Sequence, residues 1–259
     1  MKRYIILIVV VLISSNVNSQ SVEEINNESK RMISNQKFEE AIPLLQKAAK
    51  MGSPEAQYNL GICYQYGYGL EKNDSLATDC YKQAAKMGWK DAQYKMSYAY
   101  INGNGIEKSK KKAFEYALLC ANQEDIECIF NVINCYKDGI GTEKDSTKIL
   151  EWAIKLGTIE TPENLKFSGK ITSARLNLAH MYYKGDEVEK NLIKSYTWFL
   201  IYNESKRDFS VRVQEQQIQI IKDLEDSLTD NEKEKAVKLS EELLGRKLEN
   251  IAKLHQWNK

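Results

Sequence analysis

The chain has 259 residues, with 37 lysines and arginines against 36 aspartates and glutamates, so its formal net charge is only +1. Nucleic-acid-binding proteins concentrate positive charge, and this balance therefore argues against nucleic acid as a partner. Hydrophobic residues make up 42% of the chain and charged residues 28%, with only 3 prolines, which is typical of a folded protein without a long Pro/Gly linker.

The first 19 residues have the three-part pattern of a secretory signal peptide. Lys2 and Arg3 precede an unbroken apolar run over residues 5–13, and small polar residues follow up to Ser19. The apolar run is too short to cross a bilayer, which takes about 20 residues, but an uncleaved anchor is the alternative. We therefore expect an exported protein, periplasmic or secreted, that is cleaved after Ser19 and has no membrane span thereafter.

A repeat with a period of 36 residues dominates the middle of the chain. Ala56, Ala92 and Cys128 are 36 residues apart, and the same step relates two sets of glycines and a column of aromatic residues. Several independent positions that share one period predict stacked structural units. The glycines are Gly67, Gly103 and Gly139, followed by Gly69, Gly105 and Gly141, and the aromatic column is Tyr58, Tyr94 and Phe130.

Each unit divides into two helical segments joined by a glycine turn. In the first unit, the apolar spacing predicts helices over residues 56–66 and 75–86, and glycine suits the positive φ of the turn between them. One helix pair buries only one side, so several pairs must stack, and we predict an all-α, α-α solenoid. The corresponding second helix of the third unit is expected to end at Leu156, two or three residues short of its counterparts.

The register of the repeat sets the expected boundaries. Gly185 follows Gly139 by 46 residues, which is one period plus an insertion of 10, and Glu187 replaces the second turn glycine, so we expect that turn to differ. Thr229 and Glu232 form a capping-box pattern before a helix that reaches Leu244. The expected segments are a signal peptide (1–19), an N-terminal helical cap or half repeat (20–55), repeats at 56–91, 92–127 and 128–157 (the last degenerate), an insertion (158–173), a fourth repeat (174–204) and a C-terminal helical cap (205–259).

The repeat motif closely resembles the Sel1-like repeat family, whose helix pairs are similar to those of TPR proteins. The resemblance covers about residues 38–244. It implies a right-handed superhelix of antiparallel helix pairs that holds other proteins, often as an exported adaptor in bacteria. It rests on the run Ala56-Gln57-Tyr58-Asn59-Leu60-Gly61, on Gly67-Tyr68-Gly69-Leu70, on Tyr81 and on Ala84-Ala85.

The inner, concave surface of such a solenoid is the expected site of protein binding. Tyr and Phe contribute much of the energy at protein interfaces, so the aromatic column is the first candidate. The alternative is that an aromatic residue at this repeat position is an ordinary structural feature. With the residues one turn further on, the candidates are Tyr58, Ile62, Tyr94, Tyr98, Phe130, Asn134 and His180.

The five cysteines of an exported chain are candidates for disulfides. Some cysteine-rich, exported Sel1-type proteins carry a disulfide at the eight-residue spacing of Cys120 and Cys128, and the resemblance implies the same bond here. The alternative is two small buried side chains. Cys63 and Cys135 are expected to be too far apart to pair, whereas Cys63 meeting Cys80 stays open.

An enzymatic function is the main alternative to protein binding. Ser34 and Lys37 match the Ser-x-x-Lys nucleophile motif, and some cysteine-rich Sel1-type proteins are β-lactamase-like. The companion motifs of such enzymes are absent, so we expect no enzyme; a purely structural envelope component is a further alternative. We expect neither a cofactor nor a metal, because two histidines are too few for most zinc sites.

Overall fold

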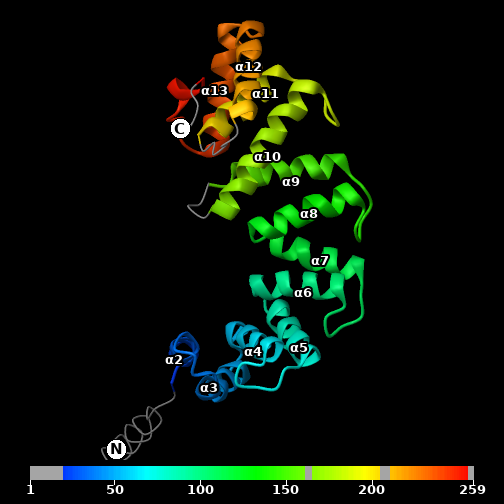
Figure 1. Ribbon diagram of the computed structural model, residues 1–259, viewed down its shortest axis with the longest axis vertical. Coiled ribbons are helices and arrows are strands. Elements are labelled where there is room, and N and C mark those ends of the chain that lie inside the picture. Colours follow the sequence, from blue (N-terminus) through cyan, green and yellow to red (C-terminus); the bar gives the residue numbers. More distant parts are fainter. Residues whose placement is uncertain (1–19, 161–164, 205–210, 256–259) are drawn as a thin grey trace, which may run out of the picture. The chain divides into compact units, whose positions relative to one another are not determined.

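The computed structural model describes residues 20–160, 165–204 and 211–255, which form the helices α2 to α13 and one short 3-10 helix (Figure 1). No strand occurs in these ranges, in agreement with the expected all-α solenoid of helix pairs. The expected signal peptide and its cleavage point after Ser19 lie outside the described residues. Among the described helices, none combines the length and hydropathy that a bilayer crossing requires. The chain divides into unit 1, residues 1–109, and unit 2, residues 110–259.

Unit 1 is a stack of five helices in which each helix packs against the next one along the chain. Its core is built from small and medium apolar side chains, because close-packed helix pairs leave little space between them. Fully or almost fully buried members include Ile25, Leu45, Ala56 and Cys63. The helices are α2 (Val22–Ser34), α3 (Phe38–Lys50), α4 (Pro54–Tyr66), α5 (Asp74–Lys86) and α6 (Lys90–Asn102).

Local capping fixes where these helices begin and end. The Ser53 side chain accepts a hydrogen bond from the backbone N–H of Ala56 at the start of α4, and Pro54 occupies the first helical turn. Gly67 ends the same helix with a φ of 75°. Both ends of α4 are therefore specified by residues within a few positions of them.

Unit 2 places its most buried helix at the centre of the C-terminal part of the chain. Helix α11 packs against α10, α12, α13 and the 3-10 helix, and its residues from Ser195 to Asn203 are all buried. The predicted C-terminal cap thus surrounds α11. The elements are α7 (Lys110–Ala121), α8 (Ile126–Asp138), α9 (Ser146–Thr158), α10 (Leu165–Lys184), α11 (Leu192–Asn203), α12 (Val211–Ser227), α13 (Asp230–Leu244) and η1 (Ile251–Lys253).

Two of the three cysteines of unit 2 form the disulfide that the family resemblance implies. Cys120 near the end of α7 is bonded to Cys128 in the first turn of α8, with the two Cα atoms 5.7 Å apart. Cys63, Cys80 and Cys135 are free thiols. Cys80 packs against the same apolar cluster as Cys63, so these two are neighbours without being bonded.

Two sequence predictions about unit 2 are wrong. Helix α9 has 13 residues, as many as α5, so the third repeat has no shortened second helix. Glu187 has a φ of 61°, close to the 66° of Gly69, so its turn keeps the left-handed conformation that we expected to change. A non-glycine residue can adopt this left-handed, positive-φ conformation at a modest energetic cost. The prediction for Glu187 assumed that this cost would change the turn. Most of the expected insertion at 158–173 is helical, because α10 already begins at Leu165.

Candidate protein-interaction surface

The predicted residues of unit 1 divide into a packed group and an exposed group. Tyr58 of α4 is half-buried, with its ring centroid 5.7 Å from that of Tyr81 and 6.4 Å from that of Trp89. Burial, reinforced by the negative charge of Asp91, raises the pKa of Tyr58 to about 12. Tyr98 of α6, by contrast, is 54% exposed. Tyr58 therefore contributes to packing, and Tyr98 is free to meet a partner.

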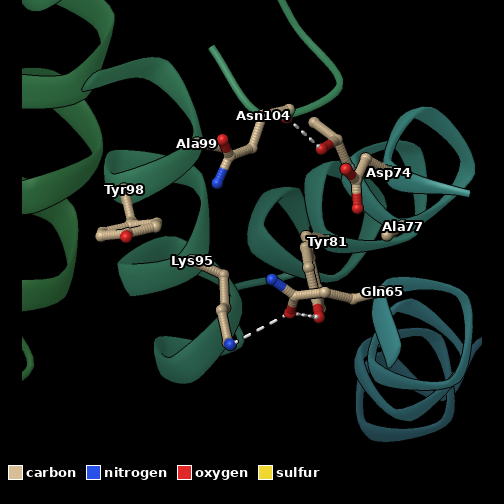
Figure 2. A pocket seen from close by; sticks show the side chains of 9 residues that line it. Gln65, Asp74, Ala77, Tyr81, Lys95, Tyr98, Ala99 and Asn104 are labelled. Carbon is tan, nitrogen blue, oxygen red and sulfur yellow. Dashed lines mark hydrogen bonds between the residues drawn. The ribbon is translucent and has the colours of Figure 1, made fainter. Parts of the chain in front are cut away.

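Tyr81 fills the space between α4 and α6 because α4 has a glycine opposite it. A Cβ atom at Gly61 would lie only 2.5 Å from the Tyr81 ring, so this residue must lack a side chain for the ring to enter. The Tyr81 hydroxyl donates to Gln65 Oε1 at 2.7 Å. The ring thereby forms one wall of a small cleft that Gln65, Lys95 and Tyr98 also line (Figure 2).

Among the described residues, Asp74 is the one carboxylate and Lys95 the one cation that line this cleft. Its Nζ donates to Gln65 Oε1 at 3.2 Å, and Figure 2 shows both Lys95 and Tyr81 converging on that oxygen. The same Nζ lies 5.8 Å from the ring centroids of both Tyr66 and Tyr81, within the range of cation–π attraction. Burial lowers the pKa of Lys95, and the negative charge of Asp91 only partly opposes this. The ammonium group is therefore held by neutral partners.

A larger, mainly apolar hollow is lined by residues of α4 and of the segments before and after it. It has a volume of about 440 Å³, and none of the side chains that line it is charged. Burial raises the pKa of the Cys63 thiol to about 11, so that this lining group is also neutral at pH 7. The rings of Phe38 and Tyr68 are stacked with their centroids 4.6 Å apart. We name this the α4 hollow; its lining residues are Ile33, Gln36, Phe38, Asn59, Ile62, Cys63 and Tyr68.

The ring of Tyr66 connects the cleft to the α4 hollow. It is 54% exposed, stacks on Tyr68 at a centroid distance of 5.5 Å and lies beneath the Lys95 ammonium. Tyr66, Gln65 and Lys95 escaped the sequence analysis because they do not recur with the 36-residue period. The pair of tyrosines that flanks Gly67 was the one available signal.

The predicted residues of unit 2 have partners within that unit. Phe130 is 37% exposed, but the Lys170 ammonium lies 4.6 Å from its ring centroid and is ion-paired with Glu127. His180 meets Phe199 edge-on at 5.6 Å, and burial lowers its pKa. Asn134 is partly buried on α8, and Tyr94, in unit 1, is partly buried on α6. The most open surface among the predicted positions is therefore that of unit 1.

The residues of the Ser-x-x-Lys motif lie on the surface. Ser34 ends α2 and is exposed, and the Lys37 ammonium donates to the Glu40 carboxylate at 3.0 Å. The motif therefore lies on exposed surface, with its lysine paired to a neighbouring carboxylate.

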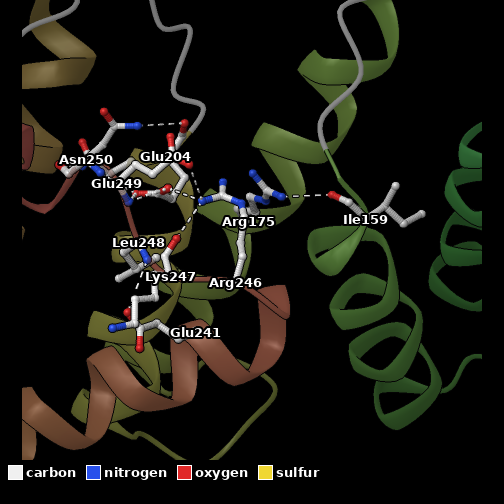
Figure 3. Close-up of polar contacts among 10 residues, drawn as sticks. Ile159, Arg175, Glu204, Glu241, Arg246, Lys247, Leu248, Glu249 and Asn250 are labelled. Atoms are coloured by element: carbon white, nitrogen blue, oxygen red, sulfur yellow. Dashed lines mark hydrogen bonds and ion pairs between the residues drawn. The ribbon is translucent and has the colours of Figure 1, made fainter.

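The buried carboxylate of Glu204, which directly follows α11, holds the C-terminal segment in place (Figure 3). The Glu204 side chain is 1% exposed and accepts hydrogen bonds from Arg246 at 2.8 Å and from the backbone N–H groups of Glu249 and Asn250. Burial disfavours its charge, but these donors outweigh that effect and lower its pKa. All of these hydrogen-bond donors belong to the chain itself, so this cluster has a structural role.

Arg175 fastens the connection between α9 and α10. The residue is 2% exposed, and it donates to the carbonyl oxygens of Gly157 at 2.7 Å and Ile159 at 3.0 Å (Figure 3). Burial lowers its pKa to about 10, with a further contribution from Arg246, while Glu204 opposes the shift. Carbonyl groups that α9 leaves unpaired at its end are thus satisfied by a side chain, which again is a structural role.

Comparison with known proteins gives matches to one repeat family. The Sel1 repeat model matches residues 35–53, 54–89, 90–125, 134–156 and 172–201. A crystal structure of a Sel1 repeat protein from Oxalobacter formigenes is similar with a TM-score of 0.58 and 21% sequence identity, over 87% of this chain and 86% of that one. No curated protein sequence matches the chain.

A second solved structure is that of c5321, a protective antigen present in uropathogenic Escherichia coli strains and displaying an SLR fold. It is similar with a TM-score of 0.61 and 22% identity, over 86% of this chain and 45% of that one. This chain therefore spans less than half the length of c5321. At these identities the likeness concerns the fold.

Proposed function

Since the chain belongs to the Sel1 repeat family, we propose that it is an exported adaptor that binds a partner protein through the surface around α4 and α6. Sel1 repeat proteins are typically interaction scaffolds, and repeat solenoids offer extended surfaces for this purpose. The export part of the proposal is supported by the disulfide between Cys120 and Cys128, because such bonds persist in oxidising compartments.

One observation carries the binding proposal: large exposed aromatic side chains gather around an uncharged hollow. Tyr68, which lines the α4 hollow of about 440 Å³, is 41% exposed, and Tyr66, which stacks on it, is 54% exposed. Tyr98, also 54% exposed, lines the adjacent cleft. Exposed apolar groups next to a cavity mark binding surfaces, and tyrosine is enriched among the residues that dominate binding energy. Among the predicted candidates, Ile62 and Tyr98 belong to this surface, and Tyr58 and Tyr94 lie on the same two helices.

Affinity capture from the source cells tests the proposal. Residues 20–259 serve as bait, beside a double variant in which Tyr66 and Tyr98 are changed to Ala. This pair is preferable to a variant that includes Tyr58, because Tyr58 packs against Tyr81 and its loss would perturb the fold. We expect one protein to be enriched by the unchanged chain and lost with the double variant.

A matched control separates binding from unfolding. Leu119 of α7 is 49% exposed and is not among the residues of the proposed surface, so Leu119→Ala removes an exposed apolar side chain without changing that surface. It should capture the same protein as the unchanged chain, and circular dichroism should give all three proteins the same helical signal. Capture of the same proteins by all three baits, or of none by the unchanged chain, would contradict the proposal.

A further inference from the structure

The Lys95 ammonium has hydrogen-bonding capacity that the chain leaves unused. An ammonium group has three N–H donors. Of these, the structure assigns one to Gln65 Oε1, an oxygen that already accepts from Tyr81. Among the described residues, no carboxylate lies within ion-pair distance of Lys95. Asp91, one helical turn earlier on α6, is near enough to affect its titration but is not paired with it.

This arrangement is costly for a lysine in the absence of a ligand. The side chain is partly buried, and its ammonium lies 5.8 Å from the ring centroids of both Tyr66 and Tyr81. Burying a charge without a counter-ion carries a desolvation penalty, which an incoming anion can offset through a charge-assisted hydrogen bond. Asp74 also lines the cleft but forms no ion pair with Lys95, so the ammonium can still pair with one incoming negative group.

The surroundings of Lys95 restrict what can carry that negative group. Tyr66 joins Lys95 to the α4 hollow, since its ring contacts both the ammonium and Tyr68. Ile62 lines the hollow and Gln65 lines the cleft, and these residues are three positions apart on α4, which is about 5 Å along a helix. Two side chains on one face of an extended peptide are separated by about 7 Å. A single peptide segment can thus reach both places.

Resting on the proposed function, we infer that Lys95 binds the carboxylate of an aspartate or glutamate in an extended segment of the partner protein, while a neighbouring apolar side chain of that segment enters the α4 hollow. The inference identifies the partner by chemistry: an acidic residue close to a large apolar residue. Lys95 supplies the charge, Gln65 holds it in place and Tyr66 provides the apolar bridge between the two positions.

Synthetic peptides test this directly. The probes are fluorescein-labelled peptides in a Gly/Ser host that carry one Phe and one Glu two residues apart, with a matched set in which Glu is replaced by Gln. Fluorescence anisotropy with the chain of residues 20–259, at about 50 mM salt to limit screening, gives both affinities. We expect the Glu peptides to bind about tenfold more tightly, as a charge-assisted hydrogen bond implies.

Variants of the protein test whether Lys95 causes the preference for Glu peptides over Gln peptides. Lys95→Met should bring the Glu and Gln peptides to equal affinity, and Lys95→Arg should restore the preference in part because it restores the charge. Lys86→Met, at the exposed end of α5, removes the same charge elsewhere and should leave the preference intact. Equal melting temperatures of the variants exclude unfolding as the cause. A Glu preference that persists in Lys95→Met, or equal binding of both sets by the unchanged chain, overturns the inference.

The capture experiment distinguishes a failure of this inference from a failure of the proposed function. If the protein captured by the unchanged chain is lost with the Tyr66 and Tyr98 double variant but retained at full yield with Lys95→Met, the adaptor function stands and the carboxylate inference fails. If the unchanged chain binds neither peptide set and enriches no protein, both fail. Loss of the captured protein with Lys95→Met, but not with Lys86→Met, supports both.

Discussion

Replacing Gly105 by Ala should show that the repeat glycines are needed for close backbone approach and not only for their positive φ. Gly105 lies in the turn after α6 with a φ of 65°. A Cβ atom there would be 2.1 Å from the carbonyl oxygen of Asp74 and 2.4 Å from its carbonyl carbon. These are backbone atoms at the start of α5, so they cannot move aside as the end of a side chain can. The substitution must therefore separate the turn from α5.

The expected loss has two parts. An alanine at positive φ costs about 1–2 kcal/mol, and forcing an additional carbon into packed surroundings typically costs about 1–3 kcal/mol. Gly105→Ala should thus lower the free energy of unfolding by about 2–5 kcal/mol. Gly88 provides the control, because its φ is 88° but nothing lies within 4 Å of a Cβ atom there. Gly88→Ala should cost only the first part, about 1–2 kcal/mol.

Urea denaturation followed by far-ultraviolet circular dichroism measures both variants. Because repeat units can unfold separately, the comparison should use the first transition and check it with limited proteolysis of unit 1. The argument is that steric contact adds to the conformational cost. If Gly105→Ala and Gly88→Ala lower the free energy of unfolding equally, steric contact adds nothing, and the positive φ alone accounts for glycine at position 105.

Three further changes test local devices in unit 2. Changing Cys120 and Cys128 together to Ala should cost about 2–3 kcal/mol on the chain-entropy model, measured by urea denaturation, whereas Cys135→Ala, at a free thiol, should cost less. Glu204→Gln should cost about 2 kcal/mol. Since the folded pKa of Glu204 is lowered, the stability that its carboxylate contributes is complete above pH 4.5 and is lost as the pH falls towards the folded pKa. Thermal stability should therefore fall less on acidification in Glu204→Gln than in the unchanged protein. Equal losses of thermal stability in the two proteins would contradict this. Thr229→Ala removes the α13 cap and should cost about 1 kcal/mol by thermal melting; no change would argue against the cap.

The sequence alone determined the features of this protein that depend on neighbours within about one helical turn. The 36-residue period predicted the helix pairs, and the capping box at Thr229 and Glu232 is present at the start of α13, which ends at Leu244 as expected. The disulfide between Cys120 and Cys128 followed from spacing and family resemblance. Caps and apolar periodicity are local properties, so they can be recognised in the sequence without knowledge of the tertiary contacts.

The tertiary structure decided which residues are exposed and what each polar group meets. Lys95 donates to a residue 30 positions away and Tyr81 to one 16 positions away, and neither contact follows the repeat. Phe130 shares the repeat position of Tyr58, but the ring of Phe130 meets the Lys170 ammonium whereas that of Tyr58 packs against Tyr81. Equivalent positions of a repeat have equivalent backbones, whereas their side chains meet whatever the neighbouring helices supply. The candidate binding surface therefore emerged only when the helices of unit 1 were packed together.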